Sequence, residues 1–250
     1  MTNKTPGTPS AFTNRNALHL DLDAKSASNR LFAGRLASVL PLQRGTSVLE
    51  VGCGGGELSF FLGQTYGLDC YGLEPFPLYA SKLEQGRIAQ AVAERIPFAD
   101  NSFDLVIAKD VIEHVDDVQQ SLNEMLRVSR KYVYLACPNY LFPYEAHFKV
   151  PFIPLLPKPL ARAYLRVLGF ARDKIGFIDH INYITKPGLY RKIRRASRQH
   201  RLVAVIDLQL AKKYSRLGFP GALVDLFTNY KIELLLVKEQ VSAESAPPQK

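Results

Sequence analysis

A short apolar segment that runs into a glycine loop is the feature that most constrains this chain. Residues 47–51 are mostly apolar, and the loop Gly52-Cys53-Gly54-Gly55-Gly56 follows them. A second apolar segment, 69–73, ends at Glu74, 18 residues beyond Gly56. Glycine lets the backbone turn sharply and approach a ligand closely, and an acid at the end of the next strand can accept hydrogen bonds from ribose hydroxyls. This order predicts an adenosine site at the carboxyl edge of a parallel sheet.

The spacing of the loop discriminates between nucleotides. A dinucleotide fingerprint reads G-x-G-x-x-G, because a pyrophosphate sits at the N-terminus of the following helix. Here the loop reads acid-x-Gly-x-Gly-x-Gly from Glu50 to Gly56, and Glu57 follows in the first helical turn. Because that carboxylate repels a diphosphate but not a cation, a nicotinamide cofactor is disfavoured.

The loop resembles the first motif of the class I S-adenosylmethionine (SAM) methyltransferases. The run Glu94-Arg95-Ile96-Pro97-Phe98, followed by Ser102-Phe103-Asp104-Leu105, resembles a second motif of the same family, and the resemblance spans about residues 45–140. It implies an α/β fold with a Rossmann-like, doubly wound sheet, mostly parallel with an antiparallel last strand. It also implies SAM as cofactor, bound by Glu50, Gly52, Cys53, Gly54, Gly56, Glu74, Pro75, Val92, Ala93 and Lys109.

One position departs from the family pattern. Where an Asp usually precedes the Ala-Glu pair and binds the adenine amino group, this chain has Val92. Adenine is therefore expected to rest on Val92, Ala93 and apolar neighbours.

Length and composition indicate one domain with an insertion. With 250 residues and 47% hydrophobic content, the chain can bury one core. We expect a flexible tail over 1–20, a methyltransferase domain over 21–238 with a lid at about 141–178, and a disordered tail over 239–250. The absence of a signal-type apolar run in the first residues, and three unpatterned cysteines that read as core residues, favour a cytoplasmic protein.

Hydrophobic periodicity predicts alternating strands and helices. Strands are expected at 47–51, 69–73, 88–92, 104–108, 131–136, 202–209 and 232–238. Helices are expected at 24–39, 57–66, 77–85, 118–129 and 186–201, with a short one at 221–228.

Charge is concentrated in the second half of the chain. Residues 1–124 hold 10 Lys/Arg against 15 Asp/Glu, whereas residues 125–250 hold 22 against 8. The lid mixes prolines and large apolar residues with Lys158, Arg162 and Arg166, so it could cover an apolar substrate or contact an anionic membrane from the inner side. The basic helix at 186–201 could bind RNA, anionic lipid or only water. Sparse aromatic residues there disfavour nucleic acid.

Two histidines are candidates for catalysis. His114 follows the fourth strand, and His147 forms a polar pair with Glu145 in the lid. Either could act as a general base if the acceptor is a hydroxyl. In the family, however, the Glu-His pair often only lines the methionine end of the pocket.

The same segment also raises a metal hypothesis, which we do not favour. Asp110, Glu113 and His114 would share a face if they lay on one helical turn, and His180 could complete the set. The pattern resembles the metal site of plant small-RNA 2′-O-methyltransferases and, in its first part, the ubiquinone-biosynthesis O-methyltransferases. Such mixed ligands suit Mn²⁺ or Zn²⁺ better than Mg²⁺.

The sequence therefore predicts a SAM-dependent methyltransferase that methylates a hydroxyl of a small apolar or amphipathic metabolite. A metal-assisted RNA 2′-O-methyltransferase and a SAM-binding membrane-surface or partner protein without turnover stay open as alternatives. The acceptor and the oligomeric state are left undetermined.

Overall fold

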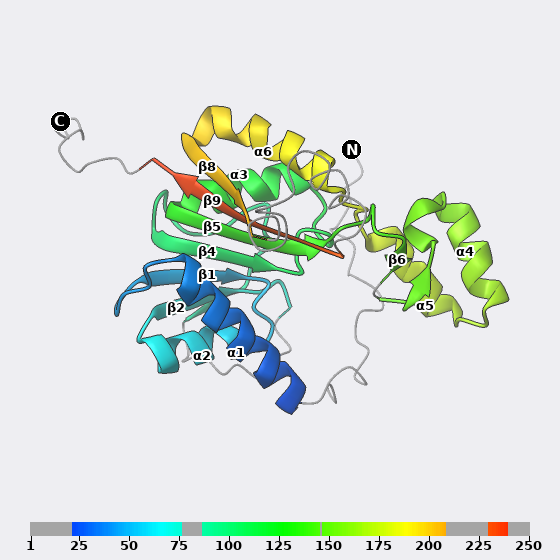
Figure 1. Cartoon of the computed structure of the whole chain (residues 1–250), viewed down its shortest axis with the longest axis horizontal. Coiled ribbons are helices and arrows are strands. Elements are labelled where there is room, and N and C mark those ends of the chain that lie inside the picture. The colour runs from blue at the N-terminus through cyan, green and yellow to red at the C-terminus, as the bar shows by residue number, and fades with distance from the viewer. Residues whose placement is uncertain (1–21, 77–86, 146, 209–229, 240–250) are drawn as a thin grey trace, which may run out of the picture.

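The computed structural model describes residues 22–76, 87–145, 147–208 and 230–239. Their centre is a seven-stranded sheet in the order β3-β2-β1-β4-β5-β9-β8 (Figure 1). The strands are β1 (Ser47–Val51), β2 (Asp69–Leu73), β3 (Ile88–Ala89), β4 (Phe103–Lys109), β5 (Ser129–Pro138), β8 (Leu202–Asp207) and β9 (Lys231–Lys238). The first five pair in parallel, and β9 runs antiparallel to both β5 and β8. The predicted sheet and its antiparallel last strand are confirmed.

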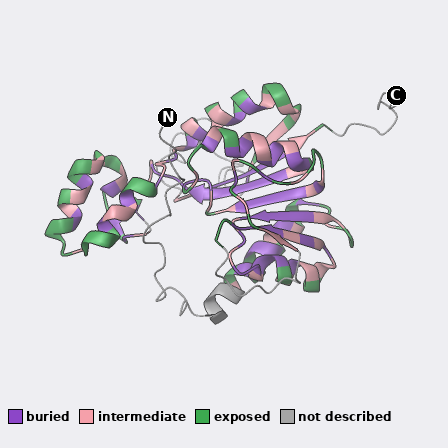
Figure 2. Cartoon of the chain, turned by 180° about the vertical axis from the view of Figure 1, so that it is seen from behind, coloured by how far each residue is buried: buried purple, intermediate pink, exposed green. Residues whose placement is uncertain are grey.

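Helices cover both faces of the sheet because its central strands are apolar on both sides. Along β1, Val48 packs on one face with α1 (Leu22–Val39) and α2 (Glu57–Tyr66), and Leu49 packs on the other with α3 (Val118–Val128) and α6 (Lys186–His200). Figure 2 shows the result, with buried central strands and exposed outer helix surfaces. Continuous apolar strands of this kind are typical of parallel sheets with helices on both faces.

Local signals set the ends of these helices. The carboxylate of Asp117 accepts hydrogen bonds from the backbone N–H groups of Gln119 and Gln120 and so caps the N-terminus of α3. The α2 helix lies between two glycines with positive φ, Gly56 at 75° and Gly67 at 66°. None of the described helices combines the length and apolar composition needed to span a bilayer.

A projecting unit, residues 141–183, interrupts the domain after β5. It contains the short strands β6 (Tyr144–Glu145) and β7 (Val150–Pro151), the helices α4 (Lys158–Val167) and α5 (Arg172–Gly176), and the 3₁₀ turns η2 (Ile153–Leu155) and η3 (Phe177–His180). Figure 1 shows α4 and α5 standing away from the sheet. Its two ends meet where Tyr140 N–H donates to the carbonyl of Ile184 at 2.9 Å and the rings of Tyr140 and Tyr183 stack.

Two sequence expectations need correction. The third strand pairs only over Ile88–Ala89 instead of continuing to Val92, because the chain turns at 93–95, where Arg95 N–H donates to the carbonyl of Val92. Residues 110–117 form turns and bends instead of a helical turn, and Asp110 has a left-handed φ of 57°. The expected helices at 77–85 and 221–228, and nearly all of both tails, lie outside the described residues.

The three cysteines are free and buried, as predicted. One of them shows why glycine is required in β2. A Cβ placed on Gly72 would lie 2.4 Å from Sγ of Cys53, which belongs to the glycine loop. The loop therefore packs directly on the backbone of its neighbouring strand.

This contact makes a stability prediction. Gly72→Ala forces the loop away from β2 and is expected to lower the free energy of unfolding by about 1–3 kcal/mol, measured by urea denaturation. Adding Cys53→Ala should recover part of the loss, because it removes the clashing sulfur. The matched control is Gly63→Ala in α2, where a Cβ meets nothing closer than 3.4 Å. If Gly72→Ala is no more destabilising than Gly63→Ala, the packing account is wrong.

Candidate active site

The glycine loop and Glu74 meet at the carboxyl edge of the sheet. Gly54 N–H donates to Oε2 of Glu74 at 2.9 Å, and Phe76 N–H donates to Oε1 at 3.3 Å. Glu74 is buried, yet a Cβ built on Gly54 would meet nothing within 4 Å. The backbone of the loop thus borders open space beside a fixed carboxylate.

Glu50 binds the first turn of α2. Its Oε2 accepts hydrogen bonds from the backbone N–H and the hydroxyl of Ser59, at 3.0 and 2.6 Å. Burial raises the pKa of Glu50 to about 7, although both hydrogen bonds act against this rise. Glu50 therefore joins β1 to α2 at the base of the loop.

The remaining predicted cofactor residues lie around the same edge. Val92 is half exposed, and Ala93 beside it is buried. Pro75 accepts a hydrogen bond from Nε2 of Gln90 through its carbonyl, and Nζ of Lys109 lies 5.6 Å from the ring centre of Phe32. Phe76, which sequence reasoning did not single out, adds an exposed aromatic side chain next to Glu74.

Both candidate histidines come together beside this edge. The rings of His114 and His147 lie 5.4 Å apart, centre to centre, in an edge-to-face arrangement. The ring of Phe177 contacts both, at 5.7 and 5.0 Å. The loop after β4 and the projecting unit thus contribute to one cluster.

A buried carboxylate orients His147. Oε1 of Glu145 lies 2.6 Å from Nδ1 of His147, and Oε2 accepts the backbone N–H of Phe148 at 2.7 Å. Glu145 is fully buried, whereas about a quarter of the His147 side chain (28%) is exposed. Burial lowers the pKa of His147, but the hydrogen bond and charge of Glu145 outweigh it, so the pKa is raised above its usual value. This places a basic imidazole, with a carboxylate behind it, at an accessible position.

His114 has the opposite character. Desolvation and the neighbouring His147 lower the pKa of His114 to about 4, and the charges of Asp110 and Glu145 only partly oppose them. By accessible surface, however, His114 is an exposed residue, whereas His147 is only half-buried. It is therefore a neutral ring in the wall of the cluster and a much weaker base than His147.

The arrangement proposed for a metal is wrong in its geometry. Asp110 is left-handed and its carboxylate binds Nζ of Lys231 at 3.0 Å. Both carboxyl oxygens of Glu113 are buried without a hydrogen-bond partner, and burial raises the pKa of Glu113 to about 8. In the part of the chain that the structure describes, no three His, Cys, Asp or Glu side chains gather as metal ligands.

The neck of the projecting unit was not foreseen from the sequence. Asn182 donates through its backbone N–H to the carbonyl of Glu113 at 2.7 Å and through Nδ2 to the carbonyl of Val115 at 2.5 Å. These bonds tie the unit to the loop that carries His114. In the sequence, the only indication of this neck is an Asn between apolar residues. Its position does not indicate which backbone carbonyls it binds.

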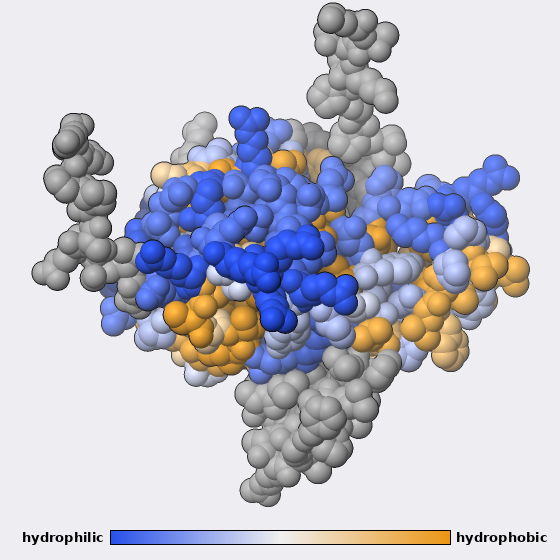
Figure 3. Space-filling model, turned by 90° about the horizontal axis from the view of Figure 1, so that it is seen from above, coloured by the Kyte–Doolittle hydropathy of each residue, from blue (hydrophilic) through white to orange (hydrophobic). Residues whose placement is uncertain are grey.

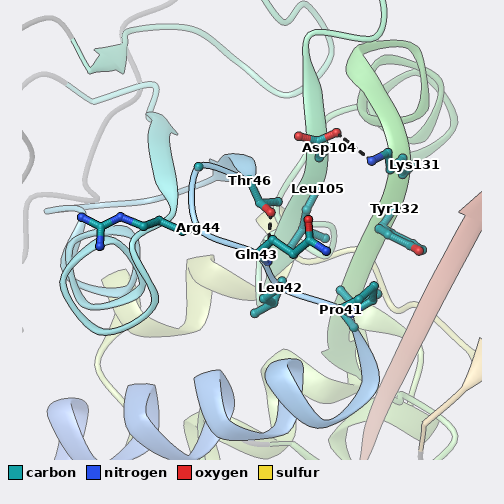
Figure 4. Close-up of a pocket in the computed structure, with 11 residues that line it drawn as sticks. Pro41, Leu42, Gln43, Arg44, Thr46, Asp104, Leu105, Lys131 and Tyr132 are labelled. Atoms are coloured by element: carbon teal, nitrogen blue, oxygen red, sulfur yellow. Dashed lines mark hydrogen bonds and ion pairs between the residues drawn. The ribbon is translucent and has the colours of Figure 1, made fainter.

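Two cavities lie at the opposite, amino edge of the sheet. One, of about 310 Å³, is bordered by the segment before β1 together with Asp104 and Lys131 (Figure 4). The other, of about 510 Å³, lies at the basic C-terminal end of α6 beside Arg127, Arg201 and Lys238. Neither includes a residue of the glycine loop or the histidine cluster, so we assign the chemistry to the carboxyl edge.

Comparison with known proteins shows which kind of domain this is. Residues 49–137 match the family described as methyltransferase domain. A probable tocopherol O-methyltransferase of Oryza sativa is 33% identical over 133 residues, which is 48% of this chain and 37% of that protein. A norajmaline N-methyltransferase of Rauvolfia serpentina is 29% identical over 99 residues, which is 36% of this chain and 34% of that protein. The chain thus spans well under half the length of these two relatives.

A solved structure shares the fold. One chain of the structure titled "Complex between the Haloferax volcanii Trm112 methyltransferase activator and the putative methyltransferase" aligns with a TM-score of 0.53 and 17% identity, covering 91% of this chain and 99% of that one. The matched family is a general one, so the narrower resemblance to the ubiquinone enzymes stays a prediction.

The buried carboxyl of Glu113 leads to a pH prediction. Its folded pKa of about 8 lies above the ordinary value of 4.5, so its contribution to stability is complete below pH 4.5 and is lost as pH rises through 8. Glu113→Gln, which does not titrate, should gain stability relative to the wild type across that window, by at most about 1.4 kcal/mol per pH unit. Urea unfolding at pH 5, 7 and 8.5 measures this.

The control for that series is Asp116→Asn, an exposed carboxyl in the same loop. The gain in Glu113→Gln between pH 5 and 8.5 should exceed any change in Asp116→Asn over the same range. A Glu113→Gln gain that is no larger would show that Glu113 is not held protonated in the folded protein.

Proposed function

We propose that this chain, whose residues 49–137 form a class I SAM-dependent methyltransferase domain, methylates a hydroxyl group of a small apolar or amphipathic metabolite. SAM is the methyl donor of the domain. The observation that carries the choice of a hydroxyl acceptor is the pair formed by His147 and the buried Glu145 beside the cofactor edge. The activity proposed for the whole protein rests on the His147–Glu145 pair and on the methyltransferase domain.

The residues at the carboxyl edge fit the cofactor. Glu74 uses two of its acceptor positions for Gly54 and Phe76, and a carboxylate has about four, so two are left for the ribose hydroxyls. Open space at Gly54 gives room for the methionine part, and Val92, Ala93 and Phe76 offer apolar surface for adenine. Apolar contact with adenine thus takes the place of the hydrogen bond that an Asp at position 92 would make to it.

His147 is suited to remove the proton of the acceptor. Glu145 accepts the hydrogen bond at Nδ1, which leaves Nε2 as the nitrogen that can take a proton from a hydroxyl. A base works best when its pKa lies near the working pH, and Glu145 raises the pKa of His147 in that direction. Bound SAM would supply the electrophilic methyl group. The bond from the acceptor oxygen to the methyl carbon would form as the bond from that carbon to the sulfonium sulfur breaks, and S-adenosylhomocysteine would leave.

His114 and Phe177 would complete the acceptor pocket as walls. The neutral ring of His114 can hydrogen-bond the acceptor without adding charge, and Phe177 supplies an apolar face. Excluding water around a positioned acceptor and donor is the main task of an enzyme in this kind of displacement.

The alternatives have less support. A metal-assisted reaction has less support because Asp110, Glu113 and His114 do not lie on one helical turn. An RNA substrate would use the basic helix α6, but Arg201, which follows that helix directly, shares its cavity with residues of the amino edge, away from the cofactor edge. A protein without turnover has no need of the accessible, carboxylate-paired His147.

The cofactor assignment predicts the effect of removing Glu74. Glu74→Ala should weaken SAM binding by roughly 10-fold to 100-fold, since hydrogen bonds to a charged group contribute about 1.5–3 kcal/mol. Calorimetric titration into metal-stripped protein measures this. Asp100→Asn, at the opposite edge of the sheet, removes a carboxylate without touching the site and should bind as the wild type does. Equal affinity in the wild type and Glu74→Ala would remove Glu74 from the cofactor site.

The base assignment predicts the pH profile. Because His147 must be neutral to accept a proton, activity should fall as pH drops through a value above 6.5. Glu145→Gln should move this fall to lower pH, because burial then acts on His147 without the opposing charge. His147→Ala should lose roughly 10²-fold to 10⁴-fold in rate together with the acid limb.

Methyl-labelled SAM and a panel of phenols and amphipathic alcohols provide the assay. His114→Ala serves as the comparison and should keep the acid limb. If His114→Ala abolishes that limb while His147→Ala retains it, the two roles are exchanged and the proposal for His147 fails.

A further inference from the structure

Exposed apolar side chains gather on the projecting unit. Among the described residues, five of the thirteen exposed large hydrophobic side chains lie within residues 152–168, and Val167 is 85% exposed. The five are Phe152, Leu155, Leu160, Val167 and Leu168. Scattered exposed apolar residues are ordinary, but a concentration of this kind indicates a contact surface.

The α4 helix is apolar on two sides. Ala161 and Leu165 are fully buried against the rest of the chain. Leu160, Ala163 and Val167 are exposed and spaced i, i+3 and i+7, so they form a second stripe that faces outward. We call this stripe, with Phe152 and Leu155 of the preceding turn, the outer face.

The segment that carries the outer face has an excess of positive charge. Residues 149–179 hold six Lys/Arg against two Asp/Glu. One of the two acids, Asp179, forms an ion pair with Arg162, while Arg166 and Arg172 are exposed at the surface. Figure 3 shows orange hydrophobic residues beside blue hydrophilic ones at the end of the molecule where Figure 1 places α4.

We propose that the outer face docks on an anionic lipid bilayer. An apolar stripe flanked by Arg and Lys is the composition of helices that lie in the membrane interface, with the stripe among the acyl chains and the cations at the headgroups. Anionic headgroups complement the excess of basic residues. Pairing of this face with a second copy would instead bring two sets of like charges together.

Docking would also give the projecting unit a role. The same unit carries His147 and Phe177, so docking would hold at the membrane the unit that contributes to the acceptor pocket. This role rests on the proposed function: a hydrophobic acceptor dissolved in the membrane would reach His147 from the lipid. The docking itself requires no turnover and is tested without it.

The experiment is vesicle flotation without SAM or acceptor. The wild type should partition onto phosphatidylcholine vesicles that contain phosphatidylglycerol, and much less onto pure phosphatidylcholine, with the difference shrinking at high salt. Leu160→Glu with Val167→Glu should lower the partition by roughly tenfold or more, and Arg166→Glu by several-fold. Both variants should keep wild-type SAM affinity, which shows that they fold and separates this test from the proposed function.

Matched controls locate the binding surface. Leu31→Glu on α1 replaces an apolar residue whose exposure lies between those of Leu160 and Val167, and Arg194→Glu on α6 reverses an exposed charge on the other basic segment. Both should bind vesicles as the wild type does. The proposal is overturned if the wild type does not bind anionic vesicles, or if Arg194→Glu removes binding while the α4 variants retain it.

Discussion

The rest of the site depends on close packing between the glycine loop and β2. Because Gly72 has no side chain, Cys53 can lie against the strand, and the loop then reaches Glu74 with the N–H of Gly54. Glu50 fixes the other end of the same loop to the start of α2 through Ser59. Two carboxylates at the ends of neighbouring strands thus hold one loop from both sides, and the open space above Gly54 follows from that arrangement.

The chemistry depends on a second construction, the attachment of the projecting unit. The bond between Tyr140 and Ile184 closes its neck, and Asn182 ties it to the carbonyls of Glu113 and Val115. Through this neck His147 comes beside His114, although the two belong to different segments. Glu145 and desolvation then give the two imidazoles opposite properties, one basic and one neutral, within 5.4 Å.

Much of this could be predicted from the sequence because the relevant signals are local. The order of strand, glycine loop and acid in residues 47–74 predicts the parallel sheet and the cofactor edge. The alternation of apolar strands with helical segments predicts a layer of helices on each face of the sheet. The conformation of Asp110 could not be predicted, because its left-handed φ and its ion pair with Lys231 depend on a strand 121 residues away. The spacing of Glu145 and His147 predicts that the two form a pair. The burial of Glu145, which strengthens its effect on the pKa of His147, depends on tertiary packing and could not be predicted.

The relatives include one O-methyltransferase and one N-methyltransferase, so the acceptor atom is the central question. The most direct measurement is the carbon NMR spectrum of the product formed from SAM with a ¹³C-labelled methyl group and an extract of amphipathic metabolites. We expect a labelled methyl carbon bonded to oxygen, and we expect this signal to be absent when His147 is replaced by Ala. A methyl carbon bonded to nitrogen, or labelled product that is unchanged in the His147 variant, would contradict the proposed function.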